Sequence, residues 1–376
     1  MLSIKTWKEL NRFKKLTNKE RRIVFYAENK ASINHFRQLI NELTKNRDLE
    51  ICYVTSIEND PFAEEENAKI NFFYIGEGSA RTQFFVTLEA DILIMDMPDL
   101  ENFHIKRSKI FPVHYIYIFH SVFSTHTYLR KDALFNFDTI FCVGPHHVNE
   151  IKKSEEMYSL KSKNLIHYGF GRIDELFLKI KKENISIDKK TIIITPTYGK
   201  NNLLERCGNE IIQLLLDSGF RVILRPHFRI LKESKYLIKN IEKKFGKNKN
   251  FSLEKGIIST ELFQKSVCMI TDWSGISFEY AFVFEKPVIF IDLPQKILNS
   301  NYKELEIEPF EIRWREKVGT IISVNNLEKI LEFLNTYDQP SLKIQIQKIR
   351  SSTIYNIGNS NKVGADYIEK FLLNKN

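Results

Sequence analysis

Short apolar runs alternate with longer amphipathic stretches through the first half of the chain. The apolar runs predict strands at residues 23–27, 51–55, 72–75, 92–95, 115–119, 139–143 and 165–168. Between them, apolar residues at helical spacing predict helices at residues 31–44, 81–89 and 146–153. Because near-continuous apolar strands separated by helices form parallel sheets covered on both faces, the pattern predicts an α/β domain.

The second half of the chain repeats the same alternation. It predicts strands at residues 191–195, 221–224, 267–271, 288–291 and 320–324. It predicts helices at residues 203–217, 233–244, 260–265, 276–284 and 327–335. A polar, lysine-rich stretch at residues 179–190 is expected to link the two halves.

The length of 376 residues exceeds that of one ordinary core and therefore predicts more than one domain. We expect a basic amphipathic segment at residues 1–22, Rossmann-like domains at 23–180 and 190–340, and C-terminal helices at 341–376 that break near Gly358. Two such domains facing each other form a central cleft at the C-terminal ends of their parallel strands, where open α/β sheets bind ligands. This is the GT-B architecture of many nucleotide-sugar transferases, although a fold alone does not fix a reaction.

The formal net charge of +9 favours an anionic partner. A nucleotide, an anionic lipid surface and nucleic acid all satisfy this condition, but the chain contains no recognisable nucleic-acid-binding motif, so nucleic acid is not expected. The cysteines, Cys52, Cys142, Cys207 and Cys268, are widely separated and form no CxxC pair. We therefore expect a reducing, cytoplasmic setting without disulfides or structural zinc.

The N-terminal segment concentrates basic residues around a regular apolar stripe. Ile4, Trp7, Leu10, Phe13 and Leu16 recur every three residues, with lysines and arginines between them. This pattern fits a helix that rests on anionic headgroups, which would make the protein peripheral on the inner face of the cell membrane. It also fits a helix that packs its stripe on its own domain, and a period of three, which drifts around an α-helix, favours this alternative. No signal peptide and no apolar run of membrane-spanning length is recognisable in the sequence.

In the first half, polar residues that could carry chemistry follow the strand at 115–119. His120 stands at the end of this strand, where a histidine can act as a general base near neutral pH. The residues after it, Ser121, Ser124, Thr125 and His126, are candidates for contact with an acceptor. Further along, His146 and His147 are adjacent. Neighbouring positions on a helix point in different directions, so we expect no metal there.

Arg172 lies in a turn that contains Gly169 and Gly171. The glycines permit close backbone approach and the guanidinium could meet a phosphate, although a plain turn into a helix explains the pattern equally well.

In the second half, each predicted strand ends in hydroxyl, cationic or imidazole groups. Thr197 follows the first strand, and Arg225 and His227 follow the second, where they could neutralise a diphosphate without a metal. After the strand at 267–271, a tight polar turn leads into a helix whose free N–H groups and dipole favour an anion. Its candidate donor-binding residues are Asp272, Ser274, Gly275 and Ser277. The alternative is an ordinary helix cap by Ser274 or Asp272.

Glu279 lies in the first turn of the same helix. Its carboxylate could reach a ribose hydroxyl of a nucleotide, or it could complete a capping box.

These motifs resemble the CDP-glycerol glycerophosphotransferase family, whose members build teichoic acids and related phosphodiester polymers. The resemblance rests on residues 195–197, 225–227, 270–281 and 286–290, and it extends in order over residues 115–324. His120 falls where the family has a His-Gly pair, and residues 169–174 resemble its glycine-arginine-aspartate turn. Ser121, Gly275 and Glu279 replace family residues, which leaves the acceptor open and allows CDP-ribitol or a nucleotide sugar as donor.

The resemblance implies a GT-B transferase that needs no metal or other cofactor. It would move a glycerol-phosphate unit from CDP-glycerol to a hydroxyl of a bacterial surface glycan or its lipid-linked precursor. His120 would deprotonate the acceptor, while His227 and the Ser274 turn would hold the donor phosphates. Two alternatives stay open: a GT-B glycosyltransferase that uses a nucleotide-activated sugar for capsule or lipopolysaccharide, and an inactive GT-B scaffold.

Overall fold

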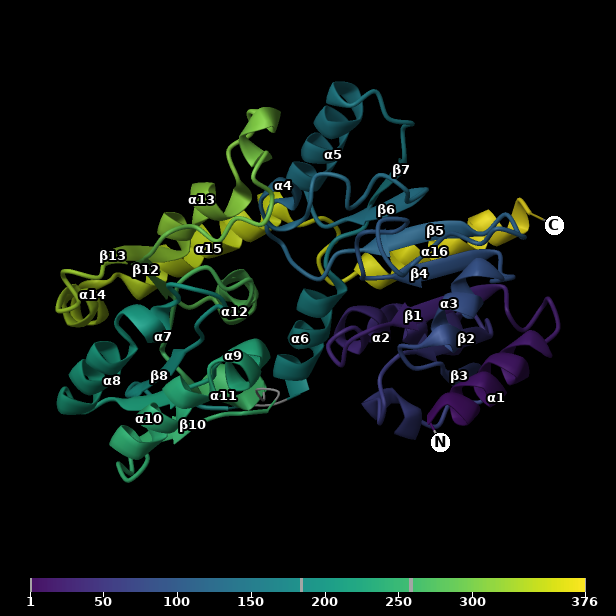
Figure 1. The fold of residues 1–376 in the computed structure, drawn as a ribbon. Helices are drawn as coiled ribbons and strands as arrows, with labels where there is room; N and C mark the ends of the chain where they lie inside the picture. The colour runs from purple at the N-terminus through teal and green to yellow at the C-terminus, as the bar shows by residue number, and fades with distance from the viewer. Residues whose placement is uncertain (1, 183–184, 257–259, 376) are drawn as a thin grey trace. The chain divides into compact units, whose positions relative to one another are not determined.

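A computed structural model describes residues 2–182, 185–256 and 260–375. Within these ranges the chain forms two compact units, each built around one parallel sheet. Unit 1 comprises residues 1–175, 298–307 and 353–376, and unit 2 comprises residues 176–297 and 308–352. Figure 1 shows helices flanking both sheets.

The sheet of unit 1 has the order β3-β2-β1-β4-β5-β6-β7, and its neighbouring strands are parallel. Its strands are β1 (Ile23–Ala27), β2 (Ile51–Thr55), β3 (Ile70–Tyr74), β4 (Ile92–Met95), β5 (His114–Ile118), β6 (Thr139–Cys142) and β7 (Asn164–His167). Its helical elements are α1 (Leu2–Lys14), α2 (Ile33–Asn41), the π-helical turn η1 (Glu42–Asn46), η2 (Pro61–Glu64), α3 (Ser79–Val86), α4 (Thr125–Tyr128), α5 (Pro145–Met157), η3 (Tyr302–Leu305) and α16 (Ser360–Leu373). The helix α6 (Gly171–Lys182) begins in unit 1 and continues into unit 2.

The sheet of unit 2 has the order β10-β9-β8-β11-β12-β13 and is also parallel. Its strands are β8 (Thr191–Ile194), β9 (Arg221–Leu224), β10 (Phe251–Leu253), β11 (Cys268–Thr271), β12 (Val288–Asp292) and β13 (Gly319–Ser323). Its helical elements are α7 (Leu203–Arg206), α8 (Gly208–Asp217), α9 (Phe228–Glu233), α10 (Lys235–Phe245), α11 (Thr260–Lys265), α12 (Ile276–Phe284), α13 (Phe310–Arg315), η4 (Glu316–Val318), α14 (Lys329–Thr336) and α15 (Gln339–Thr353).

The predicted strands recur in the structure because their apolar residues are buried on both sides of the sheets. Every residue of β1, β2, β4, β6, β8 and β11 is buried. The core of unit 1 joins β1, β2, β4, β5 and β6 to α2 and to the C-terminal helix α16, through residues such as Phe36 and Ile368. The two predicted α/β halves therefore correspond to the two sheets.

The C-terminal helices do not form a separate segment. α15 lies almost wholly in unit 2, whereas α16 returns to unit 1 and completes its core. Arg22 donates to the Leu372 carbonyl at 2.9 Å, and the Tyr367 hydroxyl bonds Thr139 at 2.6 Å. The helix α16 is thereby hydrogen-bonded to residues at two places in the sheet of unit 1.

The N-terminal helix α1 divides its apolar stripe between the core and the solvent. Leu10 and Phe13 are buried, and Phe13 packs edge-on against Phe73 at 5.4 Å between ring centroids. Ile4 and Trp7 stay 64% and 37% exposed. Packing on its own domain thus accounts for one end of the stripe, since period three drifts around a helix and its two ends face different surroundings. Contact of the exposed end with a membrane stays a prediction.

Several elements were not predicted. α6 runs into the lysine-rich stretch expected to be a linker, because lysine, leucine and glutamate are good helix formers. β10 is a short edge strand, and α4 is a single turn directly after the predicted site residue Ser124.

Candidate active site

The strand ends of unit 2 bring the predicted donor residues to one edge of the sheet. β8 lies between β9 and β11, so the residues that follow these three strands emerge at the same carboxyl edge. They are Thr195 and Thr197 after β8, Arg225 and His227 after β9, and residues 272–277 after β11. Parallel α/β sheets bind ligands at this edge.

Asp272 has a different role from the phosphate contact predicted for it. Its carboxylate is 1% exposed and accepts the backbone N–H groups of Thr197 at 2.7 Å and Leu203 at 2.9 Å. Burial raises the pKa of this carboxyl group, while those N–H donors act against the rise. Asp272 therefore fixes the loop after β8 to the turn after β11, and an anionic oxygen would repel a phosphate.

The start of α12 lies beside two buried hydroxyl groups without a hydrogen-bond partner among the described residues. Gly275 occupies the N-cap position and has no side chain with which to cap the helix, while the Ser274 carbonyl accepts the Ser277 N–H at 3.1 Å. The Ser277 hydroxyl is fully buried and has no hydrogen-bond partner among the described residues, and the same holds for the hydroxyl of Thr195. Buried hydroxyls in proteins are nearly always hydrogen-bonded, so these two groups lie where a ligand could satisfy them.

His227 is held in one tautomer. Its Nδ1 accepts the backbone N–H of Arg229 at 3.2 Å and so caps α9. Burial, with the positive charges of Arg225, Lys296 and Arg229, lowers the pKa of His227 to about 4. The neutral ring must then carry its proton on Nε2, which makes that nitrogen a hydrogen-bond donor and not a cation at neutral pH.

The positive charge near His227 comes from its neighbours. Arg229 stacks on the ring of Tyr198 at 4.3 Å, and the Lys296 ammonium lies over the same ring. Lys296 is half-buried and has no carboxylate within ion-pair distance in the described part of the chain. Burial, followed by the charge of Arg229, lowers its pKa to about 8.

Lys296 was missed by sequence reasoning. The signal was available, because it follows β12, the strand next to β11, and the ends of neighbouring parallel strands meet. Glu279 is half-buried in the first turn of α12, and its contact with a ribose stays a prediction.

In unit 1, His120 follows the interior strand β5, which lies between β4 and β6. Burial lowers its pKa below the ordinary value, and a hydrogen bond to the backbone carbonyl of Asp96 opposes that shift. Its ring lies 6.2 Å from that of His35 and 5.6 Å from that of Tyr128. A neutral imidazole that donates one N–H to a carbonyl keeps its second nitrogen as an acceptor, which is the form a general base requires.

Asp96, which was also not predicted from the sequence, directly follows the neighbouring strand β4. Its carboxyl group is 2% exposed and accepts the Ser32 hydroxyl at 2.9 Å. Burial raises its pKa to about 7. The side chain thus anchors the start of α2 beside His120.

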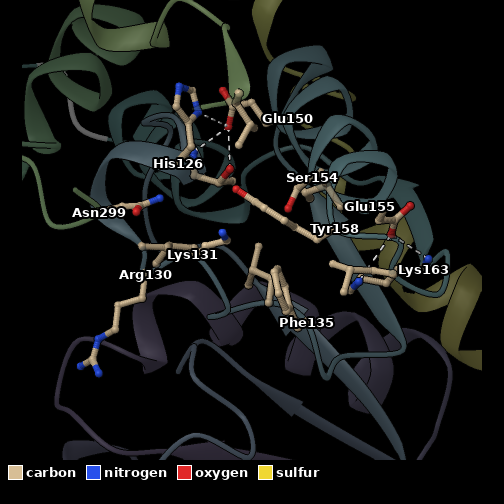
Figure 2. Close-up of a pocket in the computed structure, with 16 residues that line it drawn as sticks. His126, Arg130, Lys131, Phe135, Glu150, Ser154, Glu155, Tyr158, Lys163 and Asn299 are labelled. Atoms are coloured by element: carbon tan, nitrogen blue, oxygen red, sulfur yellow. Dashed lines mark hydrogen bonds and ion pairs between the residues drawn. The ribbon is translucent and has the colours of Figure 1, made fainter. Parts of the chain in front are cut away.

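The predicted acceptor residues after His120 are held by Glu150 of α5, as Figure 2 shows for His126. Glu150 accepts the Ser124 hydroxyl at 2.6 Å, and the Thr125 backbone N–H at 2.7 Å and hydroxyl at 2.8 Å. His126 Nδ1 lies 3.5 Å from the same carboxylate. All four side chains are buried, so the structure assigns Ser124, Thr125 and His126 to an internal network and not to an open surface. Ser121 remains partly exposed and accepts the Phe123 N–H at 3.2 Å.

The adjacent histidines of α5 belong to the same network. His146 Nε2 bonds the Val122 carbonyl and His147 Nε2 bonds the Phe123 carbonyl, each at 2.9 Å. Among the described residues, no group of three or more His, Cys, Asp or Glu side chains is arranged to hold a metal ion. A cavity of about 40 Å³ beside Glu150 has room for a water molecule but not for a nucleotide.

Arg172 pairs with Glu175 at 2.9 Å within α6. Gly169 has a φ of +103°, and a Cβ there would meet the Tyr355 carbonyl and the Ser360 hydroxyl. This glycine serves the close packing of the C-terminal segment, and a phosphate contact by Arg172 stays a prediction.

Comparison with known proteins identifies a family and related proteins. The profile of the family described as CDP-Glycerol:Poly(glycerophosphate) glycerophosphotransferase matches residues 8–296. A teichoic acid poly(glycerol phosphate) polymerase of Staphylococcus epidermidis is 30% identical over 155 residues, which are 39% of this chain and 21% of the relative. The match therefore spans about a fifth of that polymerase.

Solved structures show the same fold at low sequence identity. The wall teichoic acid polymerase TagF, in a histidine-to-asparagine variant soaked with CDPG, has a TM-score of 0.63 at 17% identity, covering 99% of this chain and 94% of that one. UDP-GlcNAc 2-epimerase from Neisseria meningitidis, bound to UDP-GlcNAc, has a TM-score of 0.61 at 15% identity, covering 93% and 99%. The S. aureus MnaA–UDP structure has a TM-score of 0.63 at 15% identity, covering 94% and 97%.

The two parallel sheets and their polar strand ends place the chain among α/β proteins of the GT-B fold. Within that fold, it belongs to the CDP-glycerol:poly(glycerophosphate) glycerophosphotransferase family.

Proposed function

We propose that the protein transfers a glycerol-phosphate unit from CDP-glycerol to a hydroxyl group of a surface glycan or its lipid-linked precursor. An acceptor oxygen attacks the phosphorus that bears glycerol, the bond from that phosphorus to the bridging oxygen breaks, and CMP leaves. The observation that carries the proposal is the edge of the unit 2 sheet, where the uncapped start of α12 and the Ser277 hydroxyl share the strand ends with His227 and Lys296.

The donor phosphates are held by groups that supply charge and hydrogen bonds separately. Arg225, Arg229 and Lys296 supply positive charge, whereas neutral His227 donates from Nε2. The backbone N–H groups of α12 and the hydroxyl of Ser277 complete the site. Because these cations offset the charge that develops on the departing CMP, the proposed reaction requires no metal ion.

His120 is the proposed base. Its lowered pKa leaves the imidazole neutral at neutral pH, ready to take the proton of the acceptor hydroxyl as the new P–O bond forms. The rate should therefore be flat near pH 7 and fall only at a pH below the ordinary histidine value of about 6.5. This role requires His120 and the donor site to meet across a cleft, as the sequence predicts.

Calorimetric titration with CDP, CDP-glycerol and UDP-N-acetylglucosamine tests the donor. We expect the cytidine compounds to bind, and His227→Ala to weaken binding about 10- to 100-fold through the lost hydrogen bond to a charged group. His167→Ala, which removes an exposed histidine stacked on Tyr355, is the matched control. Binding of the UDP-sugar but not CDP would favour a glycosyltransferase and overturn the proposal.

Transfer of labelled glycerol phosphate to a short glycerol-phosphate primer tests the chemistry. His120→Gln should abolish transfer while CDP affinity stays unchanged. Transfer at the unmodified rate would remove His120 as the base. Absence of transfer by the unmodified protein to any primer, despite CDP binding, would favour the inactive scaffold.

Peripheral attachment to an anionic membrane through α1 is a further part of the proposal. Ile4 and Trp7 are exposed beside Lys5 and Lys8, which are also exposed. The described residues contain no helix long and apolar enough to cross a bilayer. Replacing Ile4 and Trp7 with serine should reduce binding to phosphatidylglycerol vesicles, and unchanged binding would show that α1 is only structural. Deleting the helix is a poorer test, because Leu10 and Phe13 belong to the core.

A further inference from the structure

The helices α9 and α10 form a second basic surface, in unit 2, which we call the basic face. It consists of exposed lysines and two exposed aromatic residues: Lys232, Lys235, Lys239, Lys243, Lys247, Phe228 and Tyr236. The two helices follow one another in the chain and lie side by side in Figure 1. This surface is separate from the N-terminal segment that sequence reasoning singled out.

Helical geometry sorts the residues of α10 onto two opposite sides. Ile238, Ile241 and Phe245 are buried against the sheet of unit 2. At 100° per residue, Tyr236, Lys239 and Lys243 lie on the other side and point to solvent. The helix therefore needs only its inner side for folding, and its outer side contains no acidic residue.

The segment that contains α9 and α10 carries most of the net positive charge of the chain. Residues 228–249 contain eight lysines or arginines and two glutamates, a net charge of +6, against +9 for the whole chain. Both glutamates are already paired, Glu233 with Arg229 and Glu242 with Lys255, each at 2.7 Å. Across the residues that the structure describes, no carboxylate lies within ion-pair distance of Lys239, Lys243 or Lys247. A surface of this kind binds a polyanion by replacing its counterions.

The aromatic residues indicate which polyanion fits. Phe228 is 54% exposed and Tyr236 is 78% exposed, and both stand among the lysines. Exposed aromatic rings flanked by lysine are typical of surfaces that rest at the headgroup level of a bilayer, where the ring enters the interface and the ammonium groups meet phosphates. A glycerol-phosphate chain in water offers little apolar surface to such rings.

We propose that the basic face binds the surface of an anionic bilayer. Lysines near such a surface strengthen binding by about fivefold each, so the set is sufficient for reversible attachment without an inserted helix. The proposal does not depend on the transfer reaction or on the identity of the donor. It adds an attachment surface in unit 2 to the one proposed for α1 in unit 1.

Sedimentation with vesicles tests this surface. Full-length protein is mixed with vesicles of phosphatidylglycerol and phosphatidylcholine in equal parts, or of phosphatidylcholine alone. The test variant carries Lys239→Glu, Lys243→Glu and Lys247→Glu. The control carries Lys329→Glu, Lys348→Glu and Lys362→Glu, an equal change in net charge at lysines that are exposed on α14, α15 and α16.

We expect the test variant to bind the anionic vesicles at least tenfold more weakly than the control, with the same unfolding temperature. Binding should also weaken between about 0.1 and 0.5 M salt, as screening demands. Equal binding by the two variants would overturn the proposal. So would a loss of affinity confined to soluble polyanions, tested with a glycerol-phosphate oligomer and a single-stranded RNA, because the basic face would then hold a polymer and not a membrane.

Discussion

The indole N–H of Trp273 donates to the backbone carbonyl of Leu293 at 2.8 Å. Trp273 belongs to the turn before α12, and Leu293 begins the loop after β12 that carries Lys296. The Arg315 guanidinium lies over the ring of the same residue, 4.1 Å from the ring centroid. The turn before α12 and the loop that carries Lys296, both parts of the proposed donor site, are therefore fixed to each other.

Trp273→Phe should loosen this connection while keeping an aromatic ring in place. The lost hydrogen bond leaves the buried Leu293 carbonyl unsatisfied, which costs about 1–3 kcal/mol of stability. We also expect weaker CDP-glycerol binding, because Lys296 is less well fixed. Urea unfolding and calorimetric titration measure both effects, and Trp314→Phe is the control. Unchanged affinity at reduced stability would show that the contact serves the fold alone.

Lys296→Met should reduce the affinity for CDP-glycerol about 10- to 100-fold, the range expected for a charge-assisted hydrogen bond. Methionine preserves the length of the side chain, so its contact with Tyr198 is largely retained. Lys348→Met, on the exposed side of α15, is the control. If cytidine itself loses affinity as much as CDP-glycerol, Lys296 does not act on the phosphates.

Glu150→Gln should disturb the segment after His120. Glutamine offers one acceptor oxygen in place of two, so Ser124 and Thr125 cannot both keep their bonds. We expect amide hydrogen exchange to rise about tenfold or more across residues 121–127, with slower transfer but unchanged CDP affinity.

Glu155→Gln is the matched control for this experiment. Glu155 lies on the same helix, is also buried, and pairs with Lys163 at 3.5 Å (Figure 2). Its carboxylate also accepts the Lys163 backbone N–H at 2.9 Å, so its partner lies outside residues 121–127. Faster exchange of that segment in both variants would mean that general loosening of α5, and not Glu150, is responsible.

Stability should fall as the pH drops from about 6.5 towards 4. Burial, with the nearby His146, lowers the pKa of His147 to about 3, so the folded protein keeps this imidazole neutral while the unfolded chain protonates it near 6.5. The unfolded state then binds more protons, which removes about 1.4 kcal/mol per pH unit for one such group. His147→Asn should reduce this slope in urea titrations at pH 7, 6 and 5, and an unchanged slope would assign it to other groups.

Protonation of Glu150 should also reduce the stability of the folded protein, at a lower pH than protonation of His147. Burial alone would raise its pKa, but the hydrogen bond with His126 and the charges of nearby histidines lower it to about 2. Its contribution to stability is complete above its unfolded value of about 4.3 and is lost as the pH falls towards 2. The two groups therefore affect different parts of an acid-unfolding curve.

The two sheets could be predicted from the sequence because their strands are short apolar runs separated by helices. Such runs are buried on both sides and form parallel sheets. The sequence also identified the strand ends of His120 and His227, since chain order alone places such residues at the carboxyl edge. Residues whose roles depend on distant partners were not predictable. In the sequence, Glu150 is one glutamate on a polar helix. Its structural role depends on hydrogen bonds to a segment more than twenty residues earlier.

Two predicted site residues instead have internal partners, which residue type alone could not indicate. Asp272 and Ser124 are polar residues in the expected turns, and their type fits a ligand as well as an internal partner. Only packing distinguishes the two: Asp272 meets backbone donors from the loop after β8, and Ser124 meets Glu150. Lys296 was overlooked for the opposite reason, because a lysine in a loop usually lies in solvent.

The return of α16 to unit 1 determines how this protein can be dissected. Ala365, Ile368 and Leu372 fill the N-terminal core, so a fragment that stops at residue 175 would expose their binding surface on α2 and aggregate. Supplying residues 353–376 as a separate peptide should rescue such a fragment by complementation. A nonsense mutation that removes only the last helix would thus damage the half of the protein that is encoded first.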